Sequence, residues 1–142
     1  MAIIGLWTNA KVLVNSVDLS DHVVSVSISM SKADVETTTM GAYGKGRRPG
    51  LADESFKIKF RQDFAAANVD ATLAPLYLNG TSHAVEVRPV NAARSATNPA
   101  YVASACYLLD WPSISGDVGS SLDVEATFTV DGQSTGITRS TS

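Results

Sequence analysis

Residues 24–30 have the sequence Val-Ser-Val-Ser-Ile-Ser-Met, a strict alternation of apolar and hydroxyl side chains. Successive side chains of a β-strand point to opposite faces of a sheet, so the apolar residues would lie on one face and the serines on the other. The pattern therefore predicts a half-buried strand with a hydrophilic outer face. Its predicted core-facing residues are Val24, Val26, Ile28 and Met30.

Two further stretches, residues 54–61 (ESFKIKFR) and residues 122–130 (LDVEATFTV), alternate in the same way. In the first of them Phe56, Ile58 and Phe60 would face a core. The opposite side of that strand gives a candidate charged sheet face, made of Lys57, Lys59 and Arg61. Shorter strands are predicted over residues 11–14, 83–90 and 101–109, with a turn at Asn15 and Ser16.

One helix is predicted, over residues 69–78, where apolar side chains recur at helical spacing. Asn68 or Asp70 could cap its start, Gly80 could end it, and Pro75 favours a short or irregular helix. Its predicted apolar face is Val69, Leu73, Leu76 and Tyr77. Many strands with one helix indicate an all-β fold, a sandwich or barrel-like antiparallel sheet with one short flanking α-helix.

Length and composition indicate a single domain over residues 1–142, with 11 basic and 14 acidic residues and a net charge of −3. This charge argues against a general nucleic-acid binder. No apolar run is long enough to span a membrane, and the apolar residues 3–7 are too few for a signal peptide, so we expect neither insertion nor export. The single cysteine, Cys106, excludes an internal disulfide framework.

Two segments lack any strand or helix periodicity. Residues 31–50 contain four glycines and a proline between positions 41 and 50, which predicts a mobile loop or the tip of a long hairpin. Residues 132–142 are rich in glycine, serine and threonine, and we expect a tail that is either flexible or ordered only by a partner.

A search for reactive chemistry finds no site. His22, His83 and Cys106 are not at metal-ligand spacing, and no nucleophile-elbow motif is present. Gly41 and Gly46 have P-loop separation, but Arg47 and Arg48 follow in place of Lys-Ser or Lys-Thr. We therefore expect no catalytic, cofactor or metal site, no enzymatic activity, and a buried, inert thiol at Cys106.

Basic side chains cluster between positions 45 and 61, where six of the eleven occur. A solvated strand face and a contact with a neighbouring subunit explain this cluster about equally well, and nucleic-acid binding explains it less well. The cluster is Lys45, Arg47, Arg48, Lys57, Lys59 and Arg61. Hydrophilic strand faces, glycine-rich loops and the lack of a site together suggest an assembly unit whose polar faces could line an aqueous lumen.

Several stretches resemble the major tail tube proteins of long-tailed bacteriophages with non-contractile, siphovirus-type tails. They follow one another in order along the chain, from residue 14 to residue 142. They are residues 14–26 (VNSVDLSDHVVSV), 38–51 (TTMGAYGKGRRPGL), 60–75 (FRQDFAAANVDATLAP), 85–99 (VEVRPVNAARSATNP) and 135–142 (TGITRSTS).

The resemblance implies the phage tail tube fold, a small β-sandwich with a flanking helix. It also implies hexameric rings that stack into a hollow tube, a structural part of the virion through which DNA is ejected. Residues 31–53 would be an arm that reaches an adjacent subunit or ring. The candidate arm residues are Met40, Gly41, Tyr43, Gly44, Lys45, Gly46, Arg47, Arg48 and Pro49.

The implied partners are further copies of the chain, the tape-measure protein, the tail terminator and the tail-tip proteins, with passing DNA not specifically bound. Assembly would take place in the bacterial host cytoplasm, with no cofactor and no membrane. Six such chains would carry a negative charge, and an acidic lumen would repel DNA. Lys57, Lys59 and Arg61 facing the lumen would count against that repulsion.

Two alternatives stay open at this stage. The chain could be the inner tube of a contractile tail, which shares the tube architecture. It could instead be a protein- or carbohydrate-binding β-sandwich module, in which Trp7, Tyr43 and Trp111 form an aromatic platform.

Overall fold

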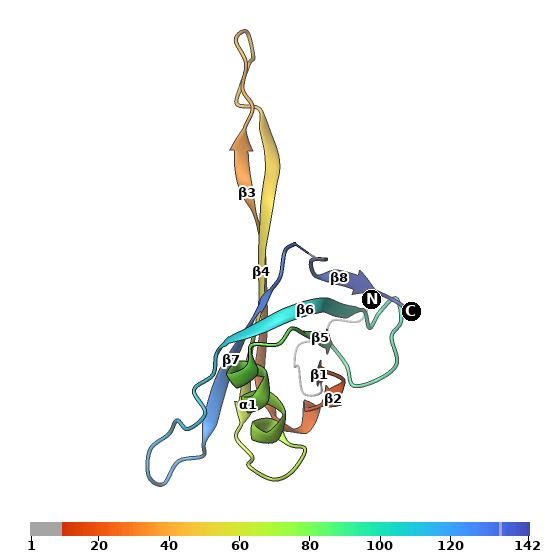
Figure 1. The fold of residues 1–142 in the computed structure, drawn as a ribbon. Helices are drawn as coiled ribbons and strands as arrows, with labels where there is room; N and C mark the ends of the chain where they lie inside the picture. Colours follow the sequence, from red (N-terminus) through yellow and green to blue (C-terminus); the bar gives the residue numbers. More distant parts are fainter. Residues whose placement is uncertain (1–9, 134) are drawn as a thin grey trace.

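The structure, a computed structural model, describes residues 10–133 and 135–142, which form eight strands, one α-helix and one 3-10 turn. All strand pairs are antiparallel, in the order β2-β1-β5-β6-β7-β4-β3, and β8 also pairs with β6 (Figure 1). The prediction of an antiparallel all-β fold with one helix is confirmed. The elements are β1 (Lys11–Val14), β2 (Val17–Asp18), η1 (Ser20–His22), β3 (Val23–Glu36), β4 (Arg47–Arg61), α1 (Val69–Asn79), β5 (His83–Arg88), β6 (Ala100–Asp110), β7 (Asp123–Val130) and β8 (Thr138–Ser140).

The core is built from one face of the sheet. Phe56 on β4 lies opposite Ile28 on β3 and Phe128 on β7, so the period-2 patterns of three strands meet in one row. Ile58 and Phe60 continue the buried face of β4, as predicted. The largest fully buried side chains are Phe56, Phe60, Phe128, Leu19, Ile58, Leu73, Val12, Val14, Val69, Val85, Val124 and Cys106.

The predicted inner face of β3 is wrong at both ends. Val24 is 43% exposed because a β-bulge between Val23 and Ser25 takes it out of the alternation. Met30 is 52% exposed because it pairs with Glu54, beyond the last β4–β7 pair at Ser55. Only the middle of the quoted stretch, Val26 and Ile28, packs against the core.

Helix α1 buries Val69, Leu73 and Leu76 against the core, whereas Tyr77, predicted on the same face, is 46% exposed. Pro75 removes one helical hydrogen bond without ending the helix. Asn68 occupies the N-cap position, but its side-chain amide donates to Asp63 and makes no capping bond. Gly80, in the left-handed conformation with φ +64°, ends the helix as the sequence indicates.

Strands β3 and β4 continue well beyond the rest of the sheet as a two-stranded hairpin, which projects away from the body of the molecule in Figure 1. Residues 31–53, here called the arm, are its projecting part. The strands pair as far as Glu36 and Arg47, and the Thr37 N–H donates to the Gly46 carbonyl across the turn at 2.8 Å. None of residues 29–53, all of them described, is buried.

The C-terminal segment differs from the flexible tail that we expected. Thr138–Ser140 forms β8 and pairs with Ala100, Tyr101 and Val102 of the same chain. Ile137 packs against the core, and its N–H donates to Glu54 at the base of the arm. Among the described residues, no helix has the length and apolar character needed to cross a membrane.

Candidate subunit interface

The arm carries apolar side chains that nothing in the described chain covers. Met40 and Tyr43 at its tip are fully exposed, and Leu51 on β4 is nearly so. A two-stranded hairpin without a packed face is marginally stable in water, and exposed apolar groups are typical of interaction sites. The arm therefore has the properties of a segment that another molecule stabilises.

The predicted arm residues lie together at this tip. Those numbered 40–46 form the turn, while Arg47, Arg48 and Pro49 begin β4. Arg47 pairs with Asp34 across the hairpin, with Nη1 and Oδ2 2.7 Å apart. No salt bridge is found for Lys45 or Arg48 within the described residues, so both are available to an acidic neighbour.

The two edge strands of the sheet differ in length. One end is β2, with two residues, and the other is β3, with 14, whose outer edge is unpaired within the described part of the chain. A long unpaired edge offers backbone N–H and C=O groups to a strand from another molecule. The β3 edge is thus a second candidate contact for a neighbouring subunit.

The three residues of the candidate charged face lie together on one surface of the sheet. Lys57, Lys59 and Arg61 lie on the solvated side of β4, between the serines of β3 and the polar residues of β7. Lys57 lies 3.9 Å from Glu125, and Arg61 lies 3.2 Å from Asp123. The sequence alone did not indicate these acidic neighbours, although both occupy polar positions of the 122–130 alternation.

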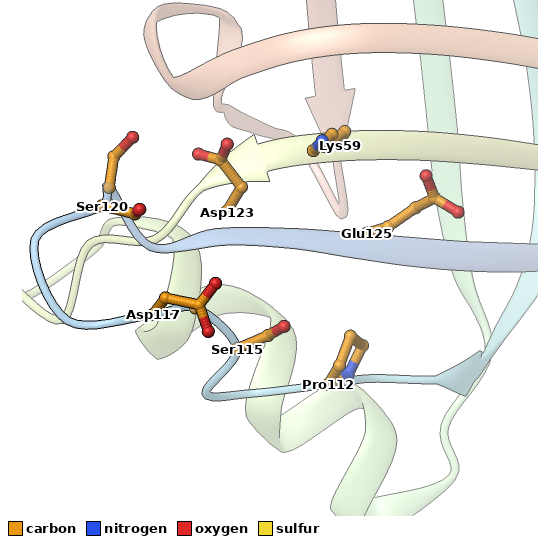
Figure 2. Close-up of a pocket in the computed structure, with 9 residues that line it drawn as sticks. Lys59, Pro112, Ser115, Asp117, Ser120, Asp123 and Glu125 are labelled. Carbon is orange, nitrogen blue, oxygen red and sulfur yellow. The ribbon is translucent and has the colours of Figure 1, made fainter.

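Beside this face, the segment between β6 and β7 forms one side of an open polar groove with a volume of about 460 Å³. Figure 2 shows Lys59, Asp123 and Glu125 on the two strands, with Asp117 and Ser115 on the connecting segment. The lining residues are Lys59, Pro112, Ser115, Gly116, Asp117, Ser120, Ser121, Asp123 and Glu125.

The fold places Cys106 directly opposite His83, a juxtaposition that the sequence spacing did not indicate. Both side chains are buried, and burial raises the pKa of the Cys106 thiol to about 12. Burial also lowers the pKa of His83, which packs edge-on against Phe128. A buried neutral thiol of this kind is unreactive, so the pair belongs to the core, as predicted for Cys106.

The aromatic platform is not formed by the residues that the structure describes. Tyr43 lies at the tip of the arm, whereas Trp111 packs against the core. Trp7, the third predicted member, lies outside the described residues. His22 lies 3.9 Å from Asp63, away from the Cys106 and His83 pair in the sheet.

Comparison with solved structures identifies the class to which this architecture corresponds, the fold of tail and injection tubes. No protein-family model and no curated protein matches the sequence. The identities below are too low to show more than a shared fold.

Three solved structures illustrate this likeness, and each matches nearly the whole of this chain. The SPP1 tail tube has a TM-score of 0.73 and 15% identity, over 99% of this chain and 80% of that one. The tail of an empty gene transfer agent (GTA) particle, refined with C6 symmetry, has a TM-score of 0.67 and 14% identity, over 99% of both chains. The sheath/tube terminator structure of PVC, an extracellular contractile injection system, has a TM-score of 0.71 and 14% identity, over 98% and 97%.

Proposed function

We propose that this chain is the structural subunit of a phage tail tube, forming hexameric rings that stack into a hollow conduit for DNA. The observation that carries the proposal is the arm, a long hairpin with no buried residue and an apolar tip, on a fold shared with tube proteins over nearly the whole chain. Six-fold rings are supported by the C6 symmetry of the GTA tail.

The tip of the arm and the part of the β3 edge that lies in the body, residues 23–30, are different surfaces on one chain, so each would meet a different surface of a neighbour. Interfaces of this head-to-tail type close into rings when the rotation closes and extend along an axis when it does not. In our proposal the β3 edge joins neighbours within a ring and the arm reaches an adjacent subunit or ring. The solvated face of β3, β4 and β7 then lines the lumen.

The proposed role is structural, within a virion assembled in the bacterial host cytoplasm. The tape-measure protein would fill the tube, and the terminator and tail-tip proteins would close its ends. We propose a non-contractile, siphovirus-type tail, for which the likeness to the SPP1 tail tube is the support. The likeness to the PVC structure favours a second candidate, the inner tube of a contractile system.

The decisive experiment is electron microscopy of the purified chain at high concentration, together with its mass by size-exclusion chromatography. The wild-type chain should form rings or hollow tubes of uniform width. A chain in which Asn-Gly replaces residues 33–51 joins Lys32 to Ala52, which are directly opposite, and should fold as a monomer. Val118→Ser, an exposed change outside the arm, is the control and should assemble normally.

Two results would contradict these assignments. Tubes of normal width from the shortened chain would show that the arm does not bridge subunits. A wild-type chain that stays monomeric at every concentration, with or without fragments of a tail tip, would overturn the tube assignment itself.

A further inference from the structure

We infer that the acidic residues of β7 mask the cations of β4, so that the solvated sheet face lets a polyanion pass without retaining it. The inference rests on the proposed function, in which this face lines the lumen. It concerns three cations, Lys57, Lys59 and Arg61, and two acids, Asp123 and Glu125.

The strand register brings two of the three cations directly opposite acids of β7, and the third is close to one of these acids. Lys59 lies directly opposite Glu125, and Arg61 lies directly opposite Asp123. The Lys57 ammonium is 3.9 Å from the Glu125 carboxylate, and the Arg61 guanidinium is 3.2 Å from that of Asp123. Glu125 is therefore within ion-pair distance of Lys57 and opposite Lys59 in the register, so each of the three cations has an acidic neighbour on β7.

The other side of the cation column carries no charge. Lys57 pairs with Ser27 and Lys59 with Ser25 on β3, so hydroxyl groups flank the column there. Figure 2 shows the carboxylates of Asp123 and Glu125 on the same side of the sheet as Lys59. On these three strands the acidic partners of the cations come from β7, and Asp117 on the segment between β6 and β7 adds a further acid to the adjoining groove.

This arrangement replaces the repulsion by net charge that the sequence suggested. At physiological ionic strength charges are screened over about 8 Å, so a passing phosphate senses the nearest groups and not the whole ring. Uncompensated lysines and arginines would displace counterions from DNA and hold it in a salt-dependent way. When DNA contacts cations that are already paired with carboxylates, few of its counterions are released, so the contact adds little binding free energy.

A contribution to folding stability explains these ion pairs less well than masking does. Lys57 is 56% and Glu125 50% exposed at the side chain, and ion pairs this exposed add little to folding. Asp123 is less exposed, at 27%, but an asparagine there keeps an oxygen that can accept from Arg61, so neutralising both acids should leave the fold intact and unmask the cations. That separation makes the inference testable.

The test compares wild-type tubes with the double variant Asp123→Asn, Glu125→Gln, which keeps side-chain shape and removes both charges. Co-sedimentation with a fluorescent 30-base-pair duplex measures retention at about 50 mM and 200 mM salt. The double variant should retain at least ten times more DNA than the wild type at the lower salt, and lose it at the higher. Asp21→Asn, Asp70→Asn, with the same net charge but changed away from this face, should behave like the wild type.

The outcomes separate this inference from the proposed function. Double-variant tubes that retain no more DNA than wild-type tubes would overturn masking, as would equal retention by the control variant. If no chain forms tubes, even with fragments of a tail tip, the proposed function fails, and the same titration on the monomers, whose face is exposed, still decides masking. Adding Lys57→Gln and Arg61→Gln to the double variant should abolish the gained retention.

Discussion

Strand β4 is one continuous segment whose two halves have opposite surroundings. Its second half, residues 55–61, lies between β3 and β7 and buries Phe56, Ile58 and Phe60 completely. Its first half, residues 47–54, pairs with β3 alone among the described residues and buries nothing. The division falls at Ser55, the last residue at which β7 lies alongside.

The second half of β4 therefore contributes to folding, and the first half is free to contribute to assembly. Burial of apolar surface stabilises the body, and the chain achieves it without the arm. Among the described residues, hairpin pairing and side-chain bonds such as that between Arg47 and Asp34 hold the arm in shape. Changes in the two halves should therefore affect different properties.

The largest effect on stability is expected from Phe56→Ala, in the buried half. Phe56 meets Ile28 and Phe128 in the central row of the core, and truncating such a ring costs about 3–5 kcal/mol. Urea denaturation followed by circular dichroism measures the loss. A change below about 1 kcal/mol would mean that this half is not the centre of the core.

The next largest effect is a pH dependence of the free energy of unfolding, which arises from Cys106 in the buried core. The pKa of the Cys106 thiol is about 12 in the folded chain, against an ordinary value of 9.0. The unfolded state therefore loses its proton first, and between pH 9 and 12 the free energy of unfolding should fall by about 1.4 kcal/mol per pH unit. Below pH 9 the thiol is protonated in both states and contributes no slope.

The measurement of the Cys106 effect is urea denaturation at several pH values, with Cys106→Ala as the matched control. Only the difference in slope between the two chains belongs to the thiol, because tyrosines and lysines titrate in both. Equal slopes would show that the thiol is accessible to solvent in the native state.

A smaller effect is expected where the two halves of β4 meet. A Cβ at Gly136 would lie too close to the Glu54 carboxylate, whose Oε1 accepts a hydrogen bond from the Ile137 N–H at 3.1 Å. The flexible Glu54 side chain can move aside, so Gly136→Ala should cost only that bond, about 0.5–1.5 kcal/mol. Glu54→Gln keeps the acceptor and is the control; equal stability of Gly136→Ala and the wild type would show that the bond is dispensable.

The smallest effect on stability is expected at the tip of the arm. Met40→Ser, Tyr43→Ser should change the free energy of unfolding by less than about 0.5 kcal/mol, because both side chains are fully exposed. The same double variant should raise the concentration needed for assembly at least ten-fold, if these residues are anchors in a neighbour. Light scattering against concentration measures this, with Val118→Ser as control; unchanged assembly would exclude the tip as an anchor.

The strands of the body were predictable because each has a solvated face and a buried face, and this contrast is local in the sequence. The prediction failed where geometry beyond the strand intervened. The bulge exposes Val24, and the end of β7 pairing exposes Met30. Residues 31–36 and 47–53 show no period because neither face of the arm is buried, so no pattern distinguishes a strand there from a loop.

The candidate surfaces were predictable in part. The cations of β4 stand out as a run of alternating charges, and the glycines and basic residues of the arm tip stand out by composition. Their neighbours depend on pairing between strands more than 60 positions apart, as in Arg61 with Asp123. The same holds for Cys106 opposite His83, where two residues 23 positions apart meet across β5 and β6.

By itself, the sequence determined which residues alternate and so which strands make the core, because burial requires side chains of the right kind at every second position. It also indicated one helix with an apolar face, of which Val69, Leu73 and Leu76 pack against the core and Tyr77 does not. The tertiary structure alone decided where β7 ends, and therefore where β4 leaves the core and becomes an arm. It alone decided that acids stand beside cations, because register is set by the whole sheet and not by any one strand.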